Sequence, residues 1–394
     1  MNRKLLIVLF VSSLIPGIVG NGLLPLLPVY ASQLGAAPGL VGAYLAISYL
    51  ALVLGSLGAG WVSNRFQRRK VVFIVAGILS VPALWLMGRV SNPWQLTGLT
   101  VFVWFIGGLN LTLLSILTGL FAPQEQRGRI FGTLALTGAL AALIGGLSIG
   151  AIVDRWGYST LFAALAGLMA LGPLLGLLLE DKPGARPERS AQKRAGAAPL
   201  GGGFYVAILA SILAGIALFV GRLGTSLDMQ GLNFPRAAIT STAAIGGLIA
   251  LPLTPLVGWL SDRYNRKFLL MLCDFACTCG LATLAISASL WHFWIAASLL
   301  SIQAYAGNGI GSALVADLVP PAALDTGLSI FSSSQFLGGI IGFATAGLAI
   351  QRFGLTGTLD AAAILGLAAI GVLALARHQQ KIGQKMAQAG AAGS

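Results

Sequence analysis

The chain has 394 residues, of which 57% are hydrophobic and only 9% are charged. Soluble domains carry about 25% charged residues, so this composition excludes an ordinary water-soluble globular protein. The net charge is +13, but the basic residues stand in short runs between apolar segments, which argues against a nucleic-acid-binding surface.

Apolar segments long enough to cross a bilayer core of roughly 30 Å recur along the whole chain. They predict an all-α integral membrane protein with twelve transmembrane helices at about 5–30, 38–62, 71–88, 96–121, 129–153, 159–179, 204–227, 238–260, 268–288, 292–316, 327–350 and 357–376. The first segment continues past Asn21 to about Tyr30, which is too long for a signal peptide, so we interpret it as an uncleaved helix. The three cysteines Cys273, Cys277 and Cys279 share the ninth helix with no further metal ligands nearby, so we expect them to serve packing.

One long polar break divides the predicted helices into two groups of six. Residues 181–203 are rich in proline, glycine and basic residues, a composition typical of a flexible cytoplasmic linker. We therefore predict an N-terminal six-helix bundle over 1–180, a C-terminal six-helix bundle over 204–377 and a cytoplasmic tail over 378–394.

The distribution of Lys and Arg predicts the orientation in the membrane. With the N-terminus in the cytoplasm, the cytoplasmic segments hold 19 basic residues and the outer loops hold 4. Cytoplasmic loops carry an excess of basic residues. We therefore expect a multi-pass protein of the plasma (inner) membrane with both termini in the cytoplasm.

The two halves resemble each other in sequence. The second helix is followed by residues 60–69, Gly-Trp-Val-Ser-Asn-Arg-Phe-Gln-Arg-Arg, and the eighth by residues 258–267, Gly-Trp-Leu-Ser-Asp-Arg-Tyr-Asn-Arg-Lys, at an offset of 198. A second pair, 154–157 and 351–354, follows the fifth and eleventh helices at an offset of 197. Because each half holds an even number of helices, both halves insert in the same direction. Such a parallel repeat predicts a solute path between the halves, near the bilayer midplane.

Both loops resemble the signature of the major facilitator superfamily, Gly-x-x-x-Asp-Arg-x-Gly-Arg-Arg between the second and third helices. The resemblance covers the whole chain and implies the major facilitator fold, two six-helix pseudo-repeats that work by alternating access. This sequence departs from the signature at Asn64, which replaces the acidic residue of the first copy, and at Gln67 and Asn265, which replace the turn glycine.

The duplicated loop is expected to latch the cytoplasmic side in one state, or else only to fix the topology. We expect Gly60 and Gly258 to let neighbouring helices pack closely, and Asp262 to pair with basic residues of its own loop. The predicted gating residues are Gly60, Asn64, Arg65, Arg68, Arg69, Gly258, Asp262, Arg263, Arg266 and Lys267.

The resemblance also implies that the first, fourth, seventh and tenth helices line a central cavity. The tenth helix carries Ser301, Tyr305 and Asn308 on one face at helical spacing. An alternative interpretation of such polar stripes is ordinary hydrogen bonding between helices. The predicted substrate-binding residues are Asn21, Trp104, Ser211, Arg222, Ser226, Tyr305, Asn308 and Ser312.

Charged residues within the membrane are costly and mark functional sites. Arg222 in the seventh helix could bind an anionic group, pair with a carboxylate or extend to the outer headgroups. The candidate residues for coupling transport to an ion are Asp228, Asp274 and Asp360, and the ion considered is the proton. We expect Asp228 and Asp360 to lie at the outer mouth, and Asp274 to pair with a residue of the cytoplasmic loop.

Residues 22–28, Gly-Leu-Leu-Pro-Leu-Leu-Pro, resemble a region of the twelve-helix drug:proton antiporters, although the fourth-helix Arg of that branch is absent here. This resemblance implies a secondary transporter of a small amphipathic solute, with efflux as the expected direction. The alternatives are uptake or exchange of a metabolite or organic anion, translocation of a lipid, and, outside transport, a membrane receptor or scaffold.

An enzyme is not expected, because the two histidines, His292 in an outer loop and His378 in the tail, lie on opposite sides of the membrane. No catalytic residue, metal site or cofactor is predicted. The expected partners are a small-molecule substrate, the lipid bilayer and protons, with no nucleic acid, and the chain is expected to be a monomer.

Overall fold

The computed structural model describes residues 3–66, 68–121, 127–179, 200–320 and 323–375, and this part of the chain is built from helices and their connecting turns. The N-terminal half contains α1 (Arg3–Leu23), α2 (Leu27–Gln33), α3 (Pro38–Phe66), α4 (Arg69–Met87), α5 (Pro93–Phe121) and α6 (Arg127–Leu177). The C-terminal half contains α7 (Gly202–Gly231), α8 (Arg236–Arg263), α9 (Arg266–Ala285), α10 (Leu290–Ile302), the π-helical turn η4 (Gln303–Gly307), α11 (Asn308–Leu318) and α12 (Leu324–Leu375).

The helices α6 and α12 each cross the membrane twice, because each turns sharply at one glycine. Gly157 has φ 77° and ψ 173°, and Gly354 has φ 76° and ψ 173°. A residue with a Cβ rarely adopts a positive φ, so glycine is required at both turns. These turns lie at the two copies of the second repeated motif, where the sequence predicted a break between helices.

Within the described residues, nine helices are long and apolar enough to cross a membrane. Dividing α6 and α12 at their glycines gives eleven spans, and the composite segment 290–318, from α10 to α11, supplies the twelfth. The protein is therefore an all-α membrane protein with the predicted twelve spans.

Two of the predicted helices are not continuous, so their predicted ranges were wrong in detail. The first segment, predicted over 5–30, breaks between α1 and α2 at a turn that holds Pro25, which has no N–H to donate to a helix. The tenth segment, predicted over 292–316, contains the π-helical turn η4 in its middle.

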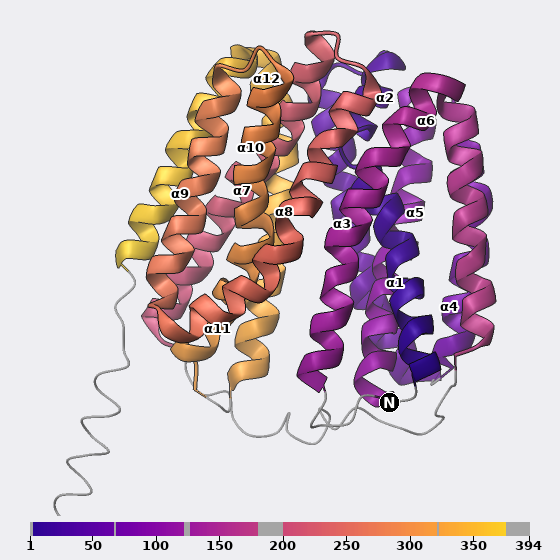
Figure 1. Ribbon diagram of the computed structural model, residues 1–394, viewed down its shortest axis with the longest axis horizontal. Coiled ribbons are helices and arrows are strands. Elements are labelled where there is room, and N and C mark those ends of the chain that lie inside the picture. Colours follow the sequence, from indigo (N-terminus) through magenta and orange to yellow (C-terminus); the bar gives the residue numbers. More distant parts are fainter. Residues whose placement is uncertain (1–2, 67, 122–126, 180–199, 321–322, 376–394) are drawn as a thin grey trace, which may run out of the picture.

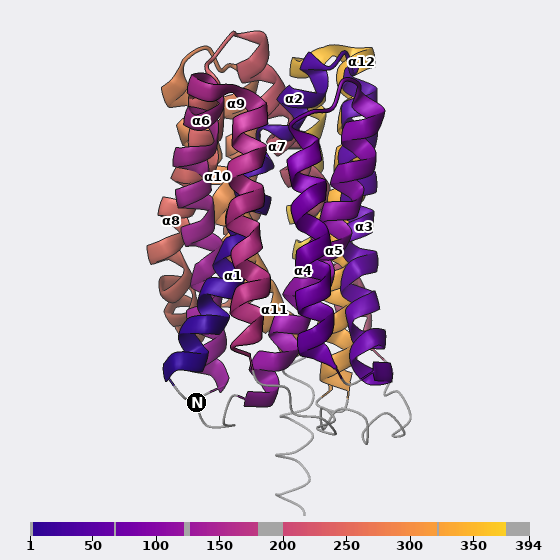
Figure 2. The same ribbon diagram turned by 90° about the vertical axis from the view of Figure 1, so that its right-hand side faces the viewer.

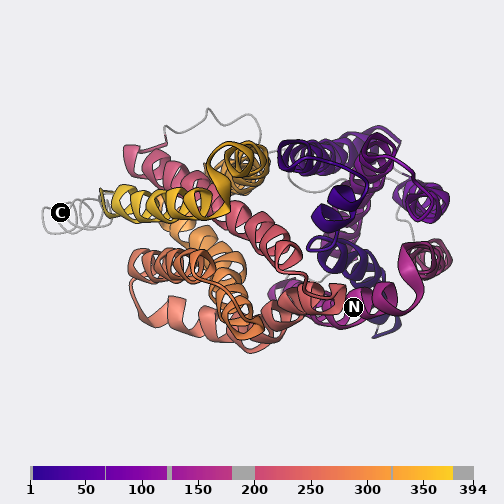
Figure 3. The ribbon, with the colours of Figure 1, turned by 90° about the horizontal axis from the view of Figure 1, so that it is seen from above.

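The two halves stand side by side as two bundles (Figure 1, Figure 3). At one end of the molecule α1 begins, α6 ends and α7 begins, and we call this the linker end (Figure 1). The turns that divide α6 and α12 lie at the opposite end, which we call the far end (Figure 2).

Equivalent lysines show that the two halves repeat in structure as well as in sequence. The Nζ of Lys70 donates to the Leu177 carbonyl oxygen at 2.7 Å, and the Nζ of Lys267 donates to the Ala374 carbonyl oxygen at 2.7 Å. The two lysines are 197 residues apart in the sequence, and so are the two carbonyl groups that they contact. The second and eighth predicted helices are related by an offset of 198, so the offset decreases by one residue within the signature loop. Arg69, rather than Arg68, is consequently the structural counterpart of Arg266.

The hydrophobic core differs between the two ends of the molecule. From the middle to the far end, one cluster of buried residues runs through both halves and includes Tyr30, Leu223 and Phe343. At the linker end, the buried apolar residues that the structure describes fall into separate clusters, one around Leu113 in the N-terminal half and others, such as that around Ile310, in the C-terminal half. The two halves are therefore packed together at the far end and apart at the linker end.

Candidate functional site

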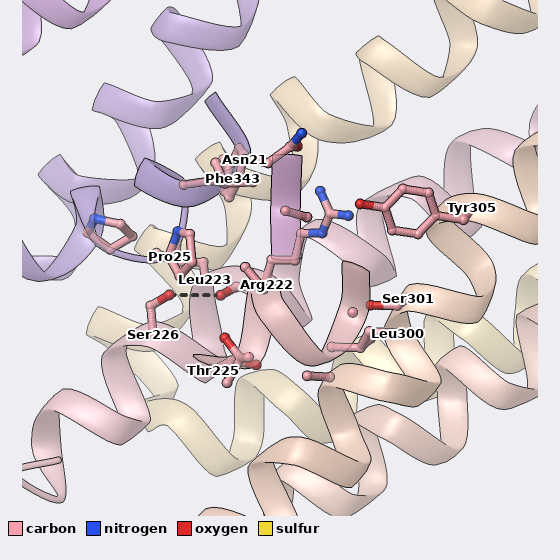
Figure 4. A pocket seen from close by; sticks show the side chains of 17 residues that line it. Asn21, Pro25, Arg222, Leu223, Thr225, Ser226, Leu300, Ser301, Tyr305 and Phe343 are labelled. Atoms are coloured by element: carbon pink, nitrogen blue, oxygen red, sulfur yellow. Dashed lines mark hydrogen bonds between the residues drawn. The ribbon is translucent and has the colours of Figure 1, made fainter. Parts of the chain in front are cut away.

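A cavity of about 690 Å³, partly open to solvent, lies between the two halves. Its N-terminal wall comes from α1, α2, the turn between them and α6, and its C-terminal wall comes from α7, α8, α10, η4 and α12. Most of the lining residues are apolar. The polar side chains in the lining are those of Asn21, Arg222, Thr225, Ser226, Thr242, Ser301 and Tyr305 (Figure 4). Apolar walls with a few placed polar groups are typical of a small-molecule site.

Four of the predicted binding residues line this cavity together: Asn21, Arg222, Ser226 and Tyr305. They come from α1, α7 and η4, which are far apart in the sequence. The Asn21 amide nitrogen donates to the Gly138 carbonyl oxygen at 3.5 Å, which links α1 to α6 beside the cavity.

The other four predicted binding residues lie outside the lining of this cavity. The ring of Trp104 packs against Tyr49, with 5.3 Å between centroids. The hydroxyl of Ser211 accepts a hydrogen bond from Ser334 at 3.2 Å, within the C-terminal half. Asn308 and Ser312 follow the π-helical turn, which adds a residue to one turn and so rotates the rest of the helix away from the face that a regular helix predicts.

Sequence reasoning missed several residues because it assigned the lining to only four helices. Thr242 from α8, Ala142 from α6 and Phe343 from α12 line the cavity, whereas α5, the fourth span, contributes none of the lining residues. A polar residue in the second turn of the eighth predicted helix was a usable signal for Thr242. No comparable signal distinguishes Phe343 from other apolar residues.

Arg222 is the charged residue of the cavity. Its guanidinium lies 5.2 Å from the centroid of the Phe219 ring, and it interacts electrostatically with the phenol groups of Tyr49 and Tyr305. The Ser226 hydroxyl donates to the backbone carbonyl oxygen of Arg222 at 3.3 Å (Figure 4). Arg222 therefore faces the cavity and does not extend toward the outer headgroups.

The three predicted coupling carboxylates lie away from the cavity lining. Asp360 is exposed near the far end, and Asp228 is half-buried in the last third of α7. Asp274 on α9 is 3% exposed, and its Oδ1 has no hydrogen-bond partner among the described residues. In that part of the chain, Asp274 does not have the cytoplasmic-loop partner that the sequence predicted.

The second copy of the signature loop forms an ion pair that the sequence did not reveal. The Arg266 guanidinium binds the carboxylate of Asp317, at the end of α11, at 2.6 Å. It also donates to the carbonyl oxygens of Ser261 and Ala313 at 3.3 and 3.2 Å. The predicted partner Asp262 is 3.9 Å away and 80% exposed, so it contributes less than Asp317 does.

The remaining predicted gating residues have different surroundings. A Cβ added at Gly60 or Gly258 would meet open space, so the prediction that these glycines bring helices together was wrong for this structure. Arg263 stacks on the Trp259 ring, with 4.1 Å to its centroid. Arg68 is exposed and Arg69 is buried. The side chains of Asn64 and Arg65 lie outside the described residues.

Two equivalent residues join the halves at the far end. The Asp154 carboxylate, from α6, accepts hydrogen bonds from the backbone amides of Arg236 at 3.1 Å and Ala237 at 2.8 Å, in the first turn of α8. Its repeat counterpart Gln351, from α12, places its side-chain oxygen against Gly39, in the first turn of α3. At each of these two contacts, a side chain from one half therefore lies at a helix N-terminus of the other half.

Comparison with protein families finds the Major Facilitator Superfamily over residues 6–311 and again over 207–391. The multidrug resistance protein MdtG of Klebsiella pneumoniae (strain 342) is 24% identical over 284 residues, which cover 68% of this chain and 68% of MdtG. The multi-drug resistance efflux pump PmrA homolog of Lactococcus lactis subsp. lactis (strain IL1403) is 28% identical over 269 residues, which cover 63% of this chain and 64% of that protein.

Two solved structures are similar in fold. The nucleoside transporter NupG superposes with a TM-score of 0.77 at 17% identity, over 94% of this chain and 99% of that chain. The peptide transporter POT in complex with sulfate gives a TM-score of 0.73 at 14% identity, over 95% of each chain. With the family model matching nearly the whole sequence and the fold shared with these transporters, the chain belongs to the major facilitator superfamily and is a multi-pass membrane transporter of small molecules.

Proposed function

We propose that this protein exports small amphipathic molecules from the cell by alternating access. The observation that carries the proposal is the division of the core, which is continuous across the far end and separate at the linker end. A solute then enters the cavity from the linker end only. Rocking of the two halves would break the far-end contacts, join the linker ends and open the same cavity to the other side.

The direction of transport depends on the orientation in the membrane. The excess of basic residues in the linker-end segments favours a cytoplasmic linker end in the plasma (inner) membrane, with both termini in the cytoplasm. The two curated relatives are named for multidrug resistance or efflux, which supports export. The cavity lies within a single chain, which supports a monomer as the transporting unit.

Protons are the proposed coupling ion, and Asp274 is the proposed proton carrier. Its carboxyl group is buried on α9, which packs against the turn η4 that carries Tyr305. With Oδ1 unpartnered among the described residues, the carboxyl can take up and release a proton without breaking an ion pair. Asp360, which is exposed, is better suited as a control than as a carrier.

Uptake into everted membrane vesicles tests export directly. The probes are three pyrene derivatives with the same apolar body: pyrenebutyrate, its uncharged amide, and a pyrenebutyl trimethylammonium cation. We expect at least one to accumulate above vesicles that lack the protein, and to be released when an ionophore collapses the proton gradient. If none of the three accumulates, export of amphipathic molecules of this size is wrong.

The proton carrier is tested in the same vesicles. Asp274→Asn should abolish the gradient-driven accumulation while leaving downhill exchange of the same probe intact. Asp360→Asn should leave both unchanged. Gradient-driven accumulation by Asp274→Asn at the wild-type level would exclude Asp274 as the carrier and would leave the export proposal untouched.

A further inference from the structure

Arg222 is a cation at membrane depth, and no carboxylate lines the cavity beside it in the part of the chain that the structure describes. It lies nine residues from the end of α7 at Gly231, roughly 14 Å along the helix axis at 1.5 Å per residue. The lining of the cavity contains no Asp or Glu side chain. Intramembrane charges usually pair with an opposite charge, because an isolated charge is costly there. The residues that line the cavity therefore supply no negative charge to balance Arg222.

The neighbours of Arg222 cannot supply that charge. Tyr49 and Tyr305 present phenol groups, which are neutral near pH 7, and Phe219 presents the face of an aromatic ring. Asp228 lies on the same helix but outside the cavity lining, and Asp274 lies on α9 and also outside it.

Three of the four Ser and Thr hydroxyl groups in the lining already donate to backbone carbonyl oxygens. Thr225 donates to the Gly221 carbonyl oxygen at 2.8 Å, Thr242 to that of Ile239 at 2.6 Å, and Ser226 to that of Arg222. The donors that remain for a ligand are the guanidinium of Arg222, the hydroxyl groups of Tyr305 and Ser301, and the second amide N–H of Asn21, and the Arg222 guanidinium is the charged one among them. Figure 4 shows the Tyr305 hydroxyl pointing toward the Arg222 guanidinium, so the two donors converge on one place.

The rest of the cavity lining is largely apolar. Pro25 and Pro28 from the N-terminal half, with Leu300 and Phe343 from the C-terminal half, form walls without hydrogen-bonding side chains. A ligand that fits this arrangement has an apolar body and one oxyanion. A guanidinium binds a carboxylate through two parallel hydrogen bonds, which fixes the orientation of such a ligand.

We propose that the solute of this transporter is an amphipathic organic anion, such as an aromatic carboxylate, whose oxyanion binds Arg222 and accepts a hydrogen bond from Tyr305. The proposal rests on the proposed export function for its biological setting, but binding itself can be measured without transport. An anion also neutralises the site, so the loaded cavity can close without leaving an unpaired charge. A lipophilic cation would meet Arg222 with the same sign of charge and would be disfavoured.

Equilibrium binding to the full-length protein in detergent tests the proposal. Transfer of tryptophan excitation to pyrene reports binding of pyrenebutyrate and of its uncharged amide, which differ only in the charged group. At pH 7.5 we expect the carboxylate to bind roughly 10- to 100-fold more tightly than the amide, the range for a hydrogen bond to a charged group. Equal affinities, or a preference for the trimethylammonium probe, would overturn the proposal.

Variants of Arg222 assign the preference to this residue. Arg222→Gln should bind the carboxylate only as tightly as the amide, and Arg222→Lys should lie between, since lysine keeps the charge but loses the bidentate fork. Arg89→Gln is the matched control, because Arg89 is exposed on the Trp85 ring at the far end and should leave both affinities unchanged. A carboxylate preference that survives Arg222→Gln would refute the assignment. If Arg222→Gln fails to fold, it will also lose binding of the amide. In that case the affinities of Arg222→Lys for the carboxylate and the amide test the assignment.

The two proposals fail in different ways. Carboxylate binding through Arg222 without accumulation of any probe in vesicles would refute export and keep the anion site. Accumulation of the amide and the cation, with no carboxylate preference in binding, would refute the anion site and keep export.

Discussion

Changing Asp154 to alanine removes the carboxylate that joins the two halves at the far end. In the structure this carboxylate accepts hydrogen bonds from the Arg236 and Ala237 amides at 3.1 and 2.8 Å. These amides belong to the first turn of α8, where backbone N–H groups have no partner within their own helix. The contact exists only while the far end is closed, so its loss destabilises the closed state and leaves the open state unaffected.

The magnitude follows from the exposure of the side chain. Removing an N-terminal helix cap costs about 0.5–2 kcal/mol. Asp154 is exposed to solvent, which screens its charge, so we take the lower part of that range, about 0.5–1 kcal/mol. The ratio of far-end-open to far-end-closed protein should then rise roughly 2- to 5-fold.

Pulsed electron paramagnetic resonance between two spin labels measures this ratio. The labels are attached to cysteines introduced at the exposed positions Thr160 in the N-terminal half and Ala288 in the C-terminal half, both near the far end. Cys279 is first changed to serine, whereas Cys273 and Cys277 can stay because they are only 5% and 2% exposed. Opening of the far end appears as a second, longer distance.

Asp360→Ala is the control, because it removes another exposed carboxylate near the same end, and it should leave the distance distribution unchanged. An unchanged distribution for Asp154→Ala would mean that the far end is held closed by apolar packing alone. An equal shift for Asp360→Ala would mean that net charge matters and the cap does not.

Three further changes, the first with Asp262→Asn as its comparison, test other contacts. In thermal unfolding, Asp317→Asn should destabilise the protein by about 1–3 kcal/mol, because its carboxylate is 23% exposed and 2.6 Å from Arg266. Asp262→Asn removes a carboxylate that is 80% exposed and should cost less than about 0.5 kcal/mol in the same measurement. Gly42→Leu should lengthen the far-end label distance, since a Cβ there would meet the backbone of α12, and an unaltered distance would contradict the close packing. Asp274→Asn should leave the melting temperature unchanged or raise it, because Oδ1 has no described partner, so a clear drop would reveal one.

The sequence predicted those features of the fold that depend on composition along the chain. Twelve apolar runs and the duplicated loop were sufficient for the spans and the pseudo-repeat, and the glycines at 157 and 354 marked the turns. The turn at Pro25 and the π-helical turn at 303–307 were not predicted, because neither is marked by a polar break between apolar segments. Hydropathy reports burial in lipid and carries no information on where a helix departs from regular geometry.

The candidate site was predictable only where a residue type was unusual for its place. Arg222 was identified because a charge is rare in a span, and it lines the cavity. Ser211 was predicted on the same helix but contacts Ser334, because a serine serves a helix contact as readily as a cavity. The predicted tenth helix ends at residue 316, which leaves Asp317 in the loop that follows. Its ion-pair partner Arg266 is 51 residues away in the sequence, so no local pattern connects the two.

The π-helical turn η4 divides a polar face that the sequence encodes as one continuous stripe. Ser301 and Tyr305 line the cavity, whereas Asn308 and Ser312, which belong to the same face of a regular helix, do not. One residue of an α-helix corresponds to about 100° of rotation at 3.6 residues per turn. Conversion of residues 303–307 to regular α-helix would therefore swing Asn308 and Ser312 toward the solute path. In that conformation the tenth span would present a solute with a more polar lining than it does in this structure.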